Sequence, residues 1–297
     1  MSAAPASPLA GRLCIVLAAL GWSLSGALTK TLTCETGPAA ALGLASPPLA
    51  GIMVAFFRAL FAGLFFVPFL RPRDVTWRWP MLPMVLVFAT MNGLFITAMT
   101  MGSAANAIIL QYTAPLWLYL AGLAWLQERG TRRDTIALII AMSGVAVIVI
   151  DACLRPTLDT LWAILIGLGS GLTYAGVIFF LRLLRRESSQ WLTVQNHLCA
   201  ALLLSPVLLW FAWPSWSQLG FLAAFGVVQM GIPYLLMSRG LRTVSASEAG
   251  TLSLLEPLLN PLWTYLAVGE APDVSTFIGG GLILLALGWR YAPFGKG

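Results

Sequence analysis

Three ionisable side chains, Arg58, His197 and Glu256, lie well inside long apolar stretches of this sequence. On insertion scales an ionisable group at the centre of a bilayer costs roughly 2.5 to 3.5 kcal/mol, so the groups kept there usually face a cavity or a partner. A carboxylate can bind an ammonium group or carry a proton, a guanidinium can bind a carboxylate, and an imidazole can relay protons. The three residues therefore point to buried charge recognition or proton transfer.

Glu256 has the most unusual local sequence, LLEPLLNPLWTYLAVGE at 254–270, in which Pro257 and Pro261 follow it. Each proline removes a backbone donor and frees the carbonyl four residues back, which for Pro257 is that of Ser253. Such carbonyls are tolerated at membrane depth only where protein or water satisfies them, so we expect a kinked cavity wall. Glu256 either recognises a substrate ammonium or carries a proton, or it is a neutral or paired carboxylate that fixes helix packing.

The other two ionisable groups also leave two interpretations open. Arg58 either meets a substrate carboxylate or has a structural role, paired with Glu256 or bonded to the carbonyls of a broken helix. His197, the sole histidine, is either a hydrogen-bonded core residue or a proton relay. One histidine supports no metal site, since zinc needs three or four ligands and no cysteine or carboxylate cluster accompanies it. We expect no metal and no cofactor.

Uncharged polar and aromatic side chains occupy the middle of the same stretches and are further candidates for a binding site. They are Trp22, Asn92, Gln111, Tyr112, Tyr174, Gln229, Tyr234, Asn260 and Trp263. Such groups offer aromatic faces for stacking or cation-π contact and amides for hydrogen bonding. We expect only part of them to touch a substrate, because aromatic stripes usually serve packing. The segment QMGIPY at 229–234 adds Gly and Pro and predicts a helix break and hinge.

The composition predicts the elements that position these residues. Of the 297 residues, 59% are hydrophobic and 9% charged, with a mean hydropathy of +0.87. Apolar runs of about 20 residues, long enough to cross a bilayer as helices, recur along the chain without strand-like alternation. We therefore predict an all-α integral membrane protein with ten transmembrane helices. The expected spans are 12–30, 49–70, 80–101, 104–126, 134–151, 160–182, 190–211, 216–238, 246–267 and 274–291.

Two features outside the polar positions complete this expectation. The spans at 134–151 and 274–291 carry small residues and almost no polar ones, so we expect them to buttress each half of the protein or to mediate a dimer. The long Gly/Pro/Ala-rich connection at 31–48 is expected to act as a lid or partial plug.

Basic residues fall almost entirely on one side of this arrangement when alternate loops are counted. Fourteen of the 17 lie on what we call the basic side: Arg12, Arg71, Arg73, Arg78, Arg129, Arg132, Arg133, Arg182, Arg185, Arg186, Arg239, Arg242, Arg290 and Lys296. The opposite, far side has Lys30 and Arg155, and Arg58 lies inside a span. The asymmetry predicts cytoplasmic N- and C-termini in a bacterial inner membrane, and it explains the net charge of +6 without nucleic-acid binding.

Two segments of the chain align without gaps at a shift of 142 residues. SAANAIILQYTAPLWLYLAGLAWLQE at 103–128 meets SASEAGTLSLLEPLLNPLWTYLAVGE at 245–270, which pairs the prolines and the terminal glutamates. Each half, 1–151 and 152–297, then has five spans. Because five is odd, the second half must enter the membrane from the opposite face, which makes the two halves an inverted repeat.

These motifs resemble the EamA repeat of the drug/metabolite transporter superfamily. The matching stretches are APLWLYLAGLAWLQE, EPLLNPLWTYLAVGE, GWSLSGALTK and FFRALFAGLFFVP. The resemblance implies two EamA-like five-helix repeats around a central cavity, and an exporter of small metabolites. Within the superfamily the chain looks most like bacterial amino-acid exporters, although LQE replaces the more usual ending of the first copy.

The sequence thus favours a secondary transporter that moves small amphipathic metabolites, above all amino acids including aromatic ones, by alternating access. The sequence contains no P-loop, so ATP is not expected to be the direct energy source. Proton coupling through Glu256 or His197 and uncoupled diffusion down a gradient are the two alternatives. Export of other drugs or metabolites is the alternative, and an intramembrane enzyme using Ser170 and His197 is the rival class. The expected partners are a small-molecule substrate and the lipid bilayer, for a monomer or homodimer without nucleic acid.

Overall fold

The computed structural model describes residues 8–114, 116–117, 120, 132–154, 158–184, 186–244, 249 and 252–291. Within these ranges the chain is helical and has no strand. In chain order the helices are α1 Pro8–Ser23, α2 Ser25–Thr33, η1 Pro38–Leu42, α3 Gly51–Phe66, η2 Val67–Phe69, η3 Pro72–Asp74, α4 Met81–Met101, α5 Ala104–Gln111, α7 Arg132–Leu154, α8 Leu158–Leu183, α9 Ser189–Leu204, η4 Ser205–Leu209, α10 Trp216–Phe225, η5 Gly226–Gly231, α11 Ile232–Gly240, α13 Leu255–Val268 and α14 Val274–Tyr291.

Six of the described helical stretches are long and apolar enough to cross a membrane. They are Leu9–Thr33, Gly51–Phe69, Met81–Met101, Thr160–Leu181, Ser189–Leu209 and Trp216–Gly240, and shorter apolar helices cover Thr135–Asp151 and Val274–Trp289. Parts of the expected fourth and ninth spans, with Pro115 and Glu128 of the first repeat copy, lie outside the described residues. The number ten stays a prediction.

The outer surface of the bundle is as apolar as its interior, which is the pattern expected in lipid. Leu209, Trp210 and Trp216 are 84%, 81% and 89% exposed, and many other large hydrophobic side chains also face outward. The interior, in contrast, holds buried polar groups, among them Arg58, Asn92 and Asn260. A water-soluble protein of this size distributes polarity the other way round.

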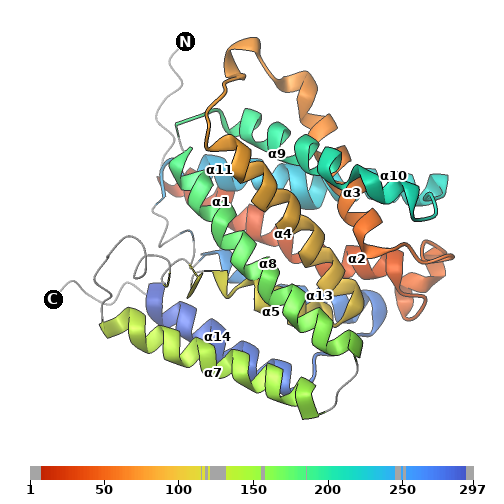
Figure 1. Cartoon of the computed structure of the whole chain (residues 1–297), viewed down its shortest axis with the longest axis vertical. Coiled ribbons are helices and arrows are strands. Elements are labelled where there is room, and N and C mark those ends of the chain that lie inside the picture. The colour runs from red at the N-terminus through yellow and green to blue at the C-terminus, as the bar shows by residue number, and fades with distance from the viewer. Residues whose placement is uncertain are drawn as a thin grey trace.

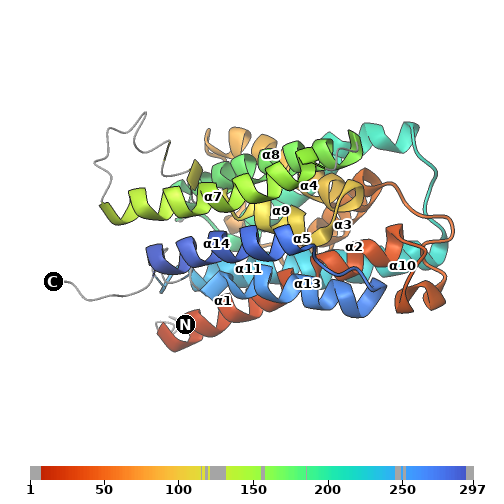
Figure 2. The same cartoon turned by 90° about the horizontal axis from the view of Figure 1, so that it is seen from below.

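The helices pack mainly across the two halves of the chain (Figures 1 and 2). Helix α4 crosses α8, and α1 packs on α11; α5 contacts α8, and α13 contacts α2. Two further pairs, α3 with α9 and α7 with α14, also join the first half of the chain to the second. Both views show α7 and α14 side by side, and in Figure 1 they lie at one edge of the bundle. The main contacts therefore run between the halves and come in pairs: α4 with α8 beside α1 with α11, and α5 with α8 beside α2 with α13.

Small residues let α7 and α14 approach closely. A Cβ added at Gly144 would lie 2.4 Å from the carbonyl oxygen of Gly279, and one added at Gly279 would lie 2.5 Å from that of Gly144. Neither glycine tolerates a side chain without movement of the backbone opposite. The small residues of these spans therefore hold the two halves together within one chain, where the sequence had suggested a buttress within each half or a dimer contact.

The expected helix break at 229–234 is present. Between α10 and α11 the chain forms one π-helical stretch, η5, and Pro233 follows at the start of α11. π-Helical turns inside α-helices occur frequently at functional sites, because the wider turn displaces backbone groups from their usual partners. Gln229 is carried by this stretch and is 2% exposed.

The connection at 31–48 is fixed against neighbouring helices. Gln218 at the start of α10 donates from Nε2 to the carbonyl oxygens of Leu44 at 2.8 Å and Pro47 at 2.9 Å. Gly37, with φ of 80°, passes so close to the end of α13 that an added Cβ would lie 2.3 Å from the backbone of Val268. The connection is thus packed on the far side of the bundle, although its expected role as a lid or plug stays a prediction.

The closest approach of α2 to α13 predicts a strong effect of substitution at Gly26. An added Cβ would lie 2.3 Å from Thr264 Oγ1 and 2.5 Å from Asn260 Oδ1. We expect Gly26→Ala to lower the free energy of unfolding by about 1–3 kcal/mol through overpacking, despite the higher helix propensity of alanine. Gly220→Ala in α10, where no atom lies within 4 Å of the added Cβ, is the matched control and should not lower it. Thermal unfolding in detergent measures both, and equal tolerance would contradict the close packing.

Candidate functional site

Arg58 on α3 is the centre of a buried polar cluster that joins three elements. Its Nε and Nη2 donate to Asn92 Oδ1 on α4 at 2.9 and 2.5 Å, and its Nη1 donates to Gln229 Oε1 on η5 at 3.2 Å. Asn92 in turn donates from Nδ2 to the carbonyl oxygen of Ala55 at 2.9 Å. Gln229 donates from Nε2 to the carbonyl oxygen of Trp22 at 3.4 Å. The guanidinium of Arg58 therefore donates to one side chain from each half of the chain.

Among the residues that the structure describes, no anion lies at ion-pair distance from Arg58. The side chain is 1% exposed, and the rings of Phe95 and Phe225 lie 6.0 and 5.8 Å from Cζ. Arg58 and Glu256 interact electrostatically but form no ion pair within 4 Å. The pairing that the sequence offered for these two residues is therefore not formed in this conformation. The described partners of this buried cation are neutral amide oxygens and aromatic rings, and a buried cation is costly unless a negative group joins it.

Glu256 on α13 instead meets a tyrosine from the other half. The hydroxyl of Tyr112 lies 2.8 Å from Glu256 Oε2 and 2.7 Å from the carbonyl oxygen of Ser253. The Ser253 carbonyl is the one that Pro257 was predicted to free, and a side chain satisfies it here. Since a hydroxyl carries a single proton, it donates fully to only one of these two acceptors. A proton on Glu256 would let the carboxyl donate to Tyr112 while Tyr112 donates to Ser253.

Tyr234 on α11 and His197 on α9 belong to a third group. Asn196 donates from Nδ2 to the hydroxyl of Tyr234 at 3.1 Å, and His197 Nδ1 lies 2.7 Å from the carbonyl oxygen of Thr193. The ring of Phe88 lies 4.9 Å from that of His197 and 5.5 Å from that of Tyr234. His197 is thus a hydrogen-bonded core residue, but its buried Nε2 has no hydrogen-bond partner among the described residues. A proton relay through His197 would use this nitrogen.

Asn260 and Trp263 connect α13 to the break between α1 and α2. Asn260 donates from Nδ2 to Ser25 Oγ at 2.8 Å, and Trp263 donates from Nε1 to Ser23 Oγ at 3.0 Å. The Oδ1 atom of Asn260 is buried without a hydrogen-bond partner. These contacts give both residues a structural role, and they leave one acceptor unused in the interior.

The structure also separates some candidates from this interior group. Gln111 is buried and donates from Nε2 to the sulfur of Met91 at 3.3 Å. Tyr174 is half-buried at the edge of the apolar core. Sequence reasoning missed Ser23, Ser25 and Asn196 as partners, because serine and asparagine in a helix give no signal of what they face. Asn196 alone had a signal in the sequence. A second, weaker alignment of the two halves, at a shift of 138 residues, pairs Arg58 with Asn196 and Pro68 with Pro206.

A charged contact joins separate elements at each end of the bundle. On the far side, Lys30 Nζ lies 2.8 Å from Glu270 Oε2 and donates to the carbonyl oxygen of Gly102 at 2.9 Å. Glu270 Oε1 accepts from the backbone N–H of Ala104 at 2.7 Å, at the N-terminus of α5. Glu270, which follows α13, is therefore bonded to α2 and α5, and its partner Lys30 also bonds the end of α4.

On the basic side, Glu187 joins the α8–α9 connection to the loop before α4. It accepts from Thr76 Oγ1 at 2.5 Å and from Arg78 Nε at 3.0 Å. The hydrogen bond from Thr76, followed by that from Arg78, lowers the pKa of Glu187. Trp191 donates from Nε1 to the carbonyl oxygen of Thr76 at 2.6 Å, which fixes the same loop.

The helices form a bundle that is apolar on its outer surface and has buried polar clusters in both halves. These features define a multi-pass membrane protein. The sequence profile of the EamA-like transporter family matches residues 9–150 and 161–289, so this chain belongs to that family. The resemblance that the sequence motifs suggested is confirmed.

Individual relatives agree with this assignment. A protein of Archaeoglobus fulgidus described as an uncharacterized transporter is 31% identical over 245 residues, which is 80% of this chain and 87% of the relative. The pseudopaline exporter CntI of Pseudomonas aeruginosa is 27% identical over 285 residues, which is 93% of this chain and 94% of the relative. A solved crystal structure matches this chain with a TM-score of 0.67 and 17% sequence identity, and the match covers 96% of this chain and 98% of the solved one. The two proteins therefore share a fold.

The family and these relatives are transporters, not enzymes. The two residues of the rival enzyme hypothesis have separate local partners. Ser170 Oγ donates to the carbonyl oxygen of Gly167 at 2.8 Å, and His197 contacts the carbonyl oxygen of Thr193. They do not form a hydrogen-bonded dyad.

The contact of Tyr112 with α13 predicts a measurable loss on Tyr112→Phe. Without the hydroxyl, the freed Ser253 carbonyl and Glu256 lose their shared partner, which should lower the free energy of unfolding by about 1–3 kcal/mol. Tyr265→Phe, on an exposed position of α13, is the matched control and should change it by no more than about 0.5 kcal/mol. Thermal unfolding in detergent at neutral pH compares them, and equal effects would remove Tyr112 from the site.

The far-side contact predicts energetic coupling between Lys30 and Glu270. Lys30→Gln and Glu270→Gln should each destabilise the protein, because each leaves a partly buried group unpaired, and the double variant should lose less than the sum. We expect a coupling free energy of about 0.5–3 kcal/mol, measured by a double-mutant cycle on unfolding. Asp273→Asn, an exposed carboxylate in the same connection, serves as control. Additive effects would show that the ion pair contributes nothing.

Proposed function

We propose that this chain is a secondary transporter that exports small zwitterionic metabolites, amino acids including aromatic ones among them, by alternating access. The observation that carries the proposal concerns two buried groups: within the described part of the chain, Arg58 has no anion at ion-pair distance and Glu256 has no cation at that distance. Opposite charges held apart in a low-dielectric interior suit a ligand that carries both an anionic and a cationic group.

The donor inventory of Arg58 supports recognition of a carboxylate. A guanidinium has five N–H donors in a fixed fork, of which three point to Asn92 and Gln229. The two others are left for a further acceptor, and a carboxylate accepts such a fork well. Asn92 and Gln229 then act as positioning residues for Arg58. Phe95 and Phe225 beside the guanidinium supply apolar surface for the body of an amphipathic substrate.

Glu256 has two roles that the site can support. As a carboxylate it accepts a substrate ammonium, and as a carboxyl it donates to Tyr112 and carries a proton across the cycle. His197, with its buried Nε2 unpartnered, is the second candidate for proton coupling. Facilitated diffusion without a proton remains the alternative, and a pH gradient separates these possibilities.

The proposed architecture is ten transmembrane helices in two inverted EamA-like repeats, 1–151 and 152–297. The paired contacts between the halves support it, α4 with α8 beside α1 with α11 and α5 with α8 beside α2 with α13. The family profile also matches two ranges, 9–150 and 161–289. The polar pairs support it as well. Arg58 bonds Asn92 in one half, and Asn196 bonds Tyr234 in the other; the 138- and 142-residue shifts relate Arg58 to Asn196 and Asn92 to Tyr234.

Two inverted bundles can exchange conformations and so open a central site to one side and then to the other. In this mechanism the Lys30–Glu270 ion pair is the contact that would hold the far side closed. An outward-open state would require the Lys30–Glu270 ion pair to separate. The contacts of Glu187 with Thr76 and Arg78 would then keep the basic side closed. The charge asymmetry supports a bacterial inner membrane with cytoplasmic N- and C-termini.

The relative named as a pseudopaline exporter supports export as the direction of transport. Its substrate does not carry over at 27% identity, and export of other metabolites or drugs is the second candidate within the same mechanism. A panel of radiolabelled metabolites in proteoliposomes, with and without a pH gradient, tests the proposal directly. Saturable movement of unmodified zwitterions supports it, and transport confined to uncharged compounds overturns it.

Substitution at Arg58 should discriminate between substrates that differ in one group. We expect Arg58→Lys to weaken transport of phenylalanine about tenfold or more, because a lysine cannot offer the same fork, and to leave its decarboxylated amine nearly unchanged. Arg71→Lys on the surface is the matched control, and size-exclusion chromatography monitors folding. An equal loss for both compounds would assign Arg58 a purely structural role.

Glu256→Gln, in the same proteoliposomes, tests the proton carrier. If Glu256 carries the coupled proton, the stimulation by a pH gradient should disappear while binding persists. An unchanged rate with an unchanged pH dependence would eliminate this role.

A further inference from the structure

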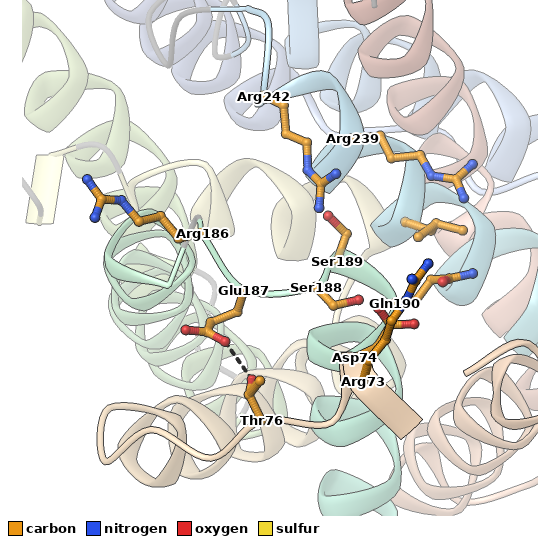
Figure 3. A pocket seen from close by; sticks show the side chains of 11 residues that line it. Arg73, Asp74, Thr76, Arg186, Glu187, Ser188, Ser189, Gln190, Arg239 and Arg242 are labelled. Carbon is orange, nitrogen blue, oxygen red and sulfur yellow. Dashed lines mark hydrogen bonds between the residues drawn. The ribbon is translucent and has the colours of Figure 1, made fainter. Parts of the chain in front are cut away.

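A pocket lies at the basic side of the bundle, and none of the Arg58 cluster residues lines it. It has a volume of about 420 Å³ and is lined by three segments: the loop before α4, the α8–α9 connection and the end of α11 (Figure 3). The α11 wall belongs to the second half of the chain and the loop before α4 to the first. The pocket therefore lies where the two halves meet.

Four arginines line this pocket: Arg73, Arg186, Arg239 and Arg242. All four are exposed, and in the part of the chain that the structure describes none of their side chains has a hydrogen bond or ion pair. In Figure 3 Arg239 and Arg242 extend from the end of α11 and the side chain of Arg73 extends from the loop before α4, whereas Arg186 points away from them. The arginines that line the pocket thus come from different segments of the chain.

The two carboxylates in the pocket wall offset only part of this charge, because they face four arginines and neither forms a hydrogen bond or ion pair with any of the four. Asp74 Oδ2 accepts from the backbone N–H of Arg71 at 3.2 Å, within its own short turn. Glu187 accepts from Thr76 and from Arg78, and neither donor is one of the four arginines. The pocket therefore keeps an excess of positive charge.

The N-terminus of α9 adds to this field. Ser188 caps the helix by accepting from the backbone N–H of Trp191 at 3.4 Å, and Ser189 and Gln190 of its first turn line the pocket. The positive end of a helix dipole favours an anion, and the arginines stand on the same side of it. A cavity, an excess of guanidinium groups over carboxylates and a helix N-terminus converge on one place.

We propose that this pocket is a binding site for an oxyanion, the carboxylate or phosphate group of an anionic small molecule or of a phospholipid headgroup. Arginine forks match both groups, and basic pockets between transmembrane helices bind anionic headgroups. The exposed Trp77 and Trp79 in the adjoining loop are residues typical of the interfacial level at which headgroups lie. The site is separate from the interior one and does not depend on what the interior site transports.

The test compares purified full-length protein with Arg239→Gln/Arg242→Gln and with Arg71→Gln as the matched control. Arg71 is exposed two residues from Arg73 and does not line the pocket. One arm titrates citrate and inorganic phosphate by calorimetry, with glucose as the neutral reference. The other arm counts phosphatidylglycerol and phosphatidylcholine molecules retained in native mass spectrometry. All substituted arginines are exposed, so folding should be unaffected, and size-exclusion chromatography verifies it.

We expect the double variant to bind the anion at least tenfold more weakly, with Arg71→Gln unchanged, and the affinity to fall as salt is raised. Loss confined to citrate or phosphate assigns the site to soluble anions, and loss confined to phosphatidylglycerol assigns it to lipid. Arg239→Lys/Arg242→Lys should retain part of the affinity, because it keeps the charge without the fork. The proposal is overturned if wild-type protein binds neither kind of anion better than its neutral reference, or if the double variant binds both like wild type.

Discussion

The structure depends on how one buried guanidinium is held. Arg58 is 1% exposed, and its ligands are the amide oxygens of Asn92 and Gln229, from a helix of its own half and from the π-helical stretch of the other. Neutral ligands satisfy the donors but do not neutralise the charge, so the cluster stays incomplete in a way that an ion pair would not. Gln229 reaches Arg58 from this π-helical stretch, whose wider turn sets the direction in which the side chain leaves the helix.

Much of the fold could be predicted from the sequence, because a bilayer allows few solutions. Composition and run length predict helices, and the prolines and glycines at 229–234 and around Glu256 predict where these helices deviate. The Ser253 carbonyl shows how far such reasoning reaches: proline chemistry identifies it as needing a donor. That Tyr112 supplies the donor was not predictable, because the contact joins residues 141 positions apart through packing of α5 on α13.

The site was predicted as a set of residues but not as a set of contacts. All the expected ionisable groups are buried, yet Arg58 and Glu256 have separate partners, and Trp263 and Asn260 serve the break between α1 and α2. Sequence gives the depth of a residue in a span but not its rotation about the helix axis, since the spans are apolar on all faces. Asn196 illustrates this limit, because only its position relative to Arg58 in the repeat distinguished it.

The close crossing of α7 and α14 gives the proposed exchange of conformations a fixed point. Gly144 and Gly279 lie backbone to backbone where α7, the last described helix of the first half, crosses α14, the last described helix of the second. In the proposed mechanism such a contact is the pivot: the two bundles tilt about it while the backbone distances between α7 and α14 stay constant. Covalent attachment of the two helices near these glycines would then leave the molecule able to cycle, while the same tether between α2 and α13 would arrest it.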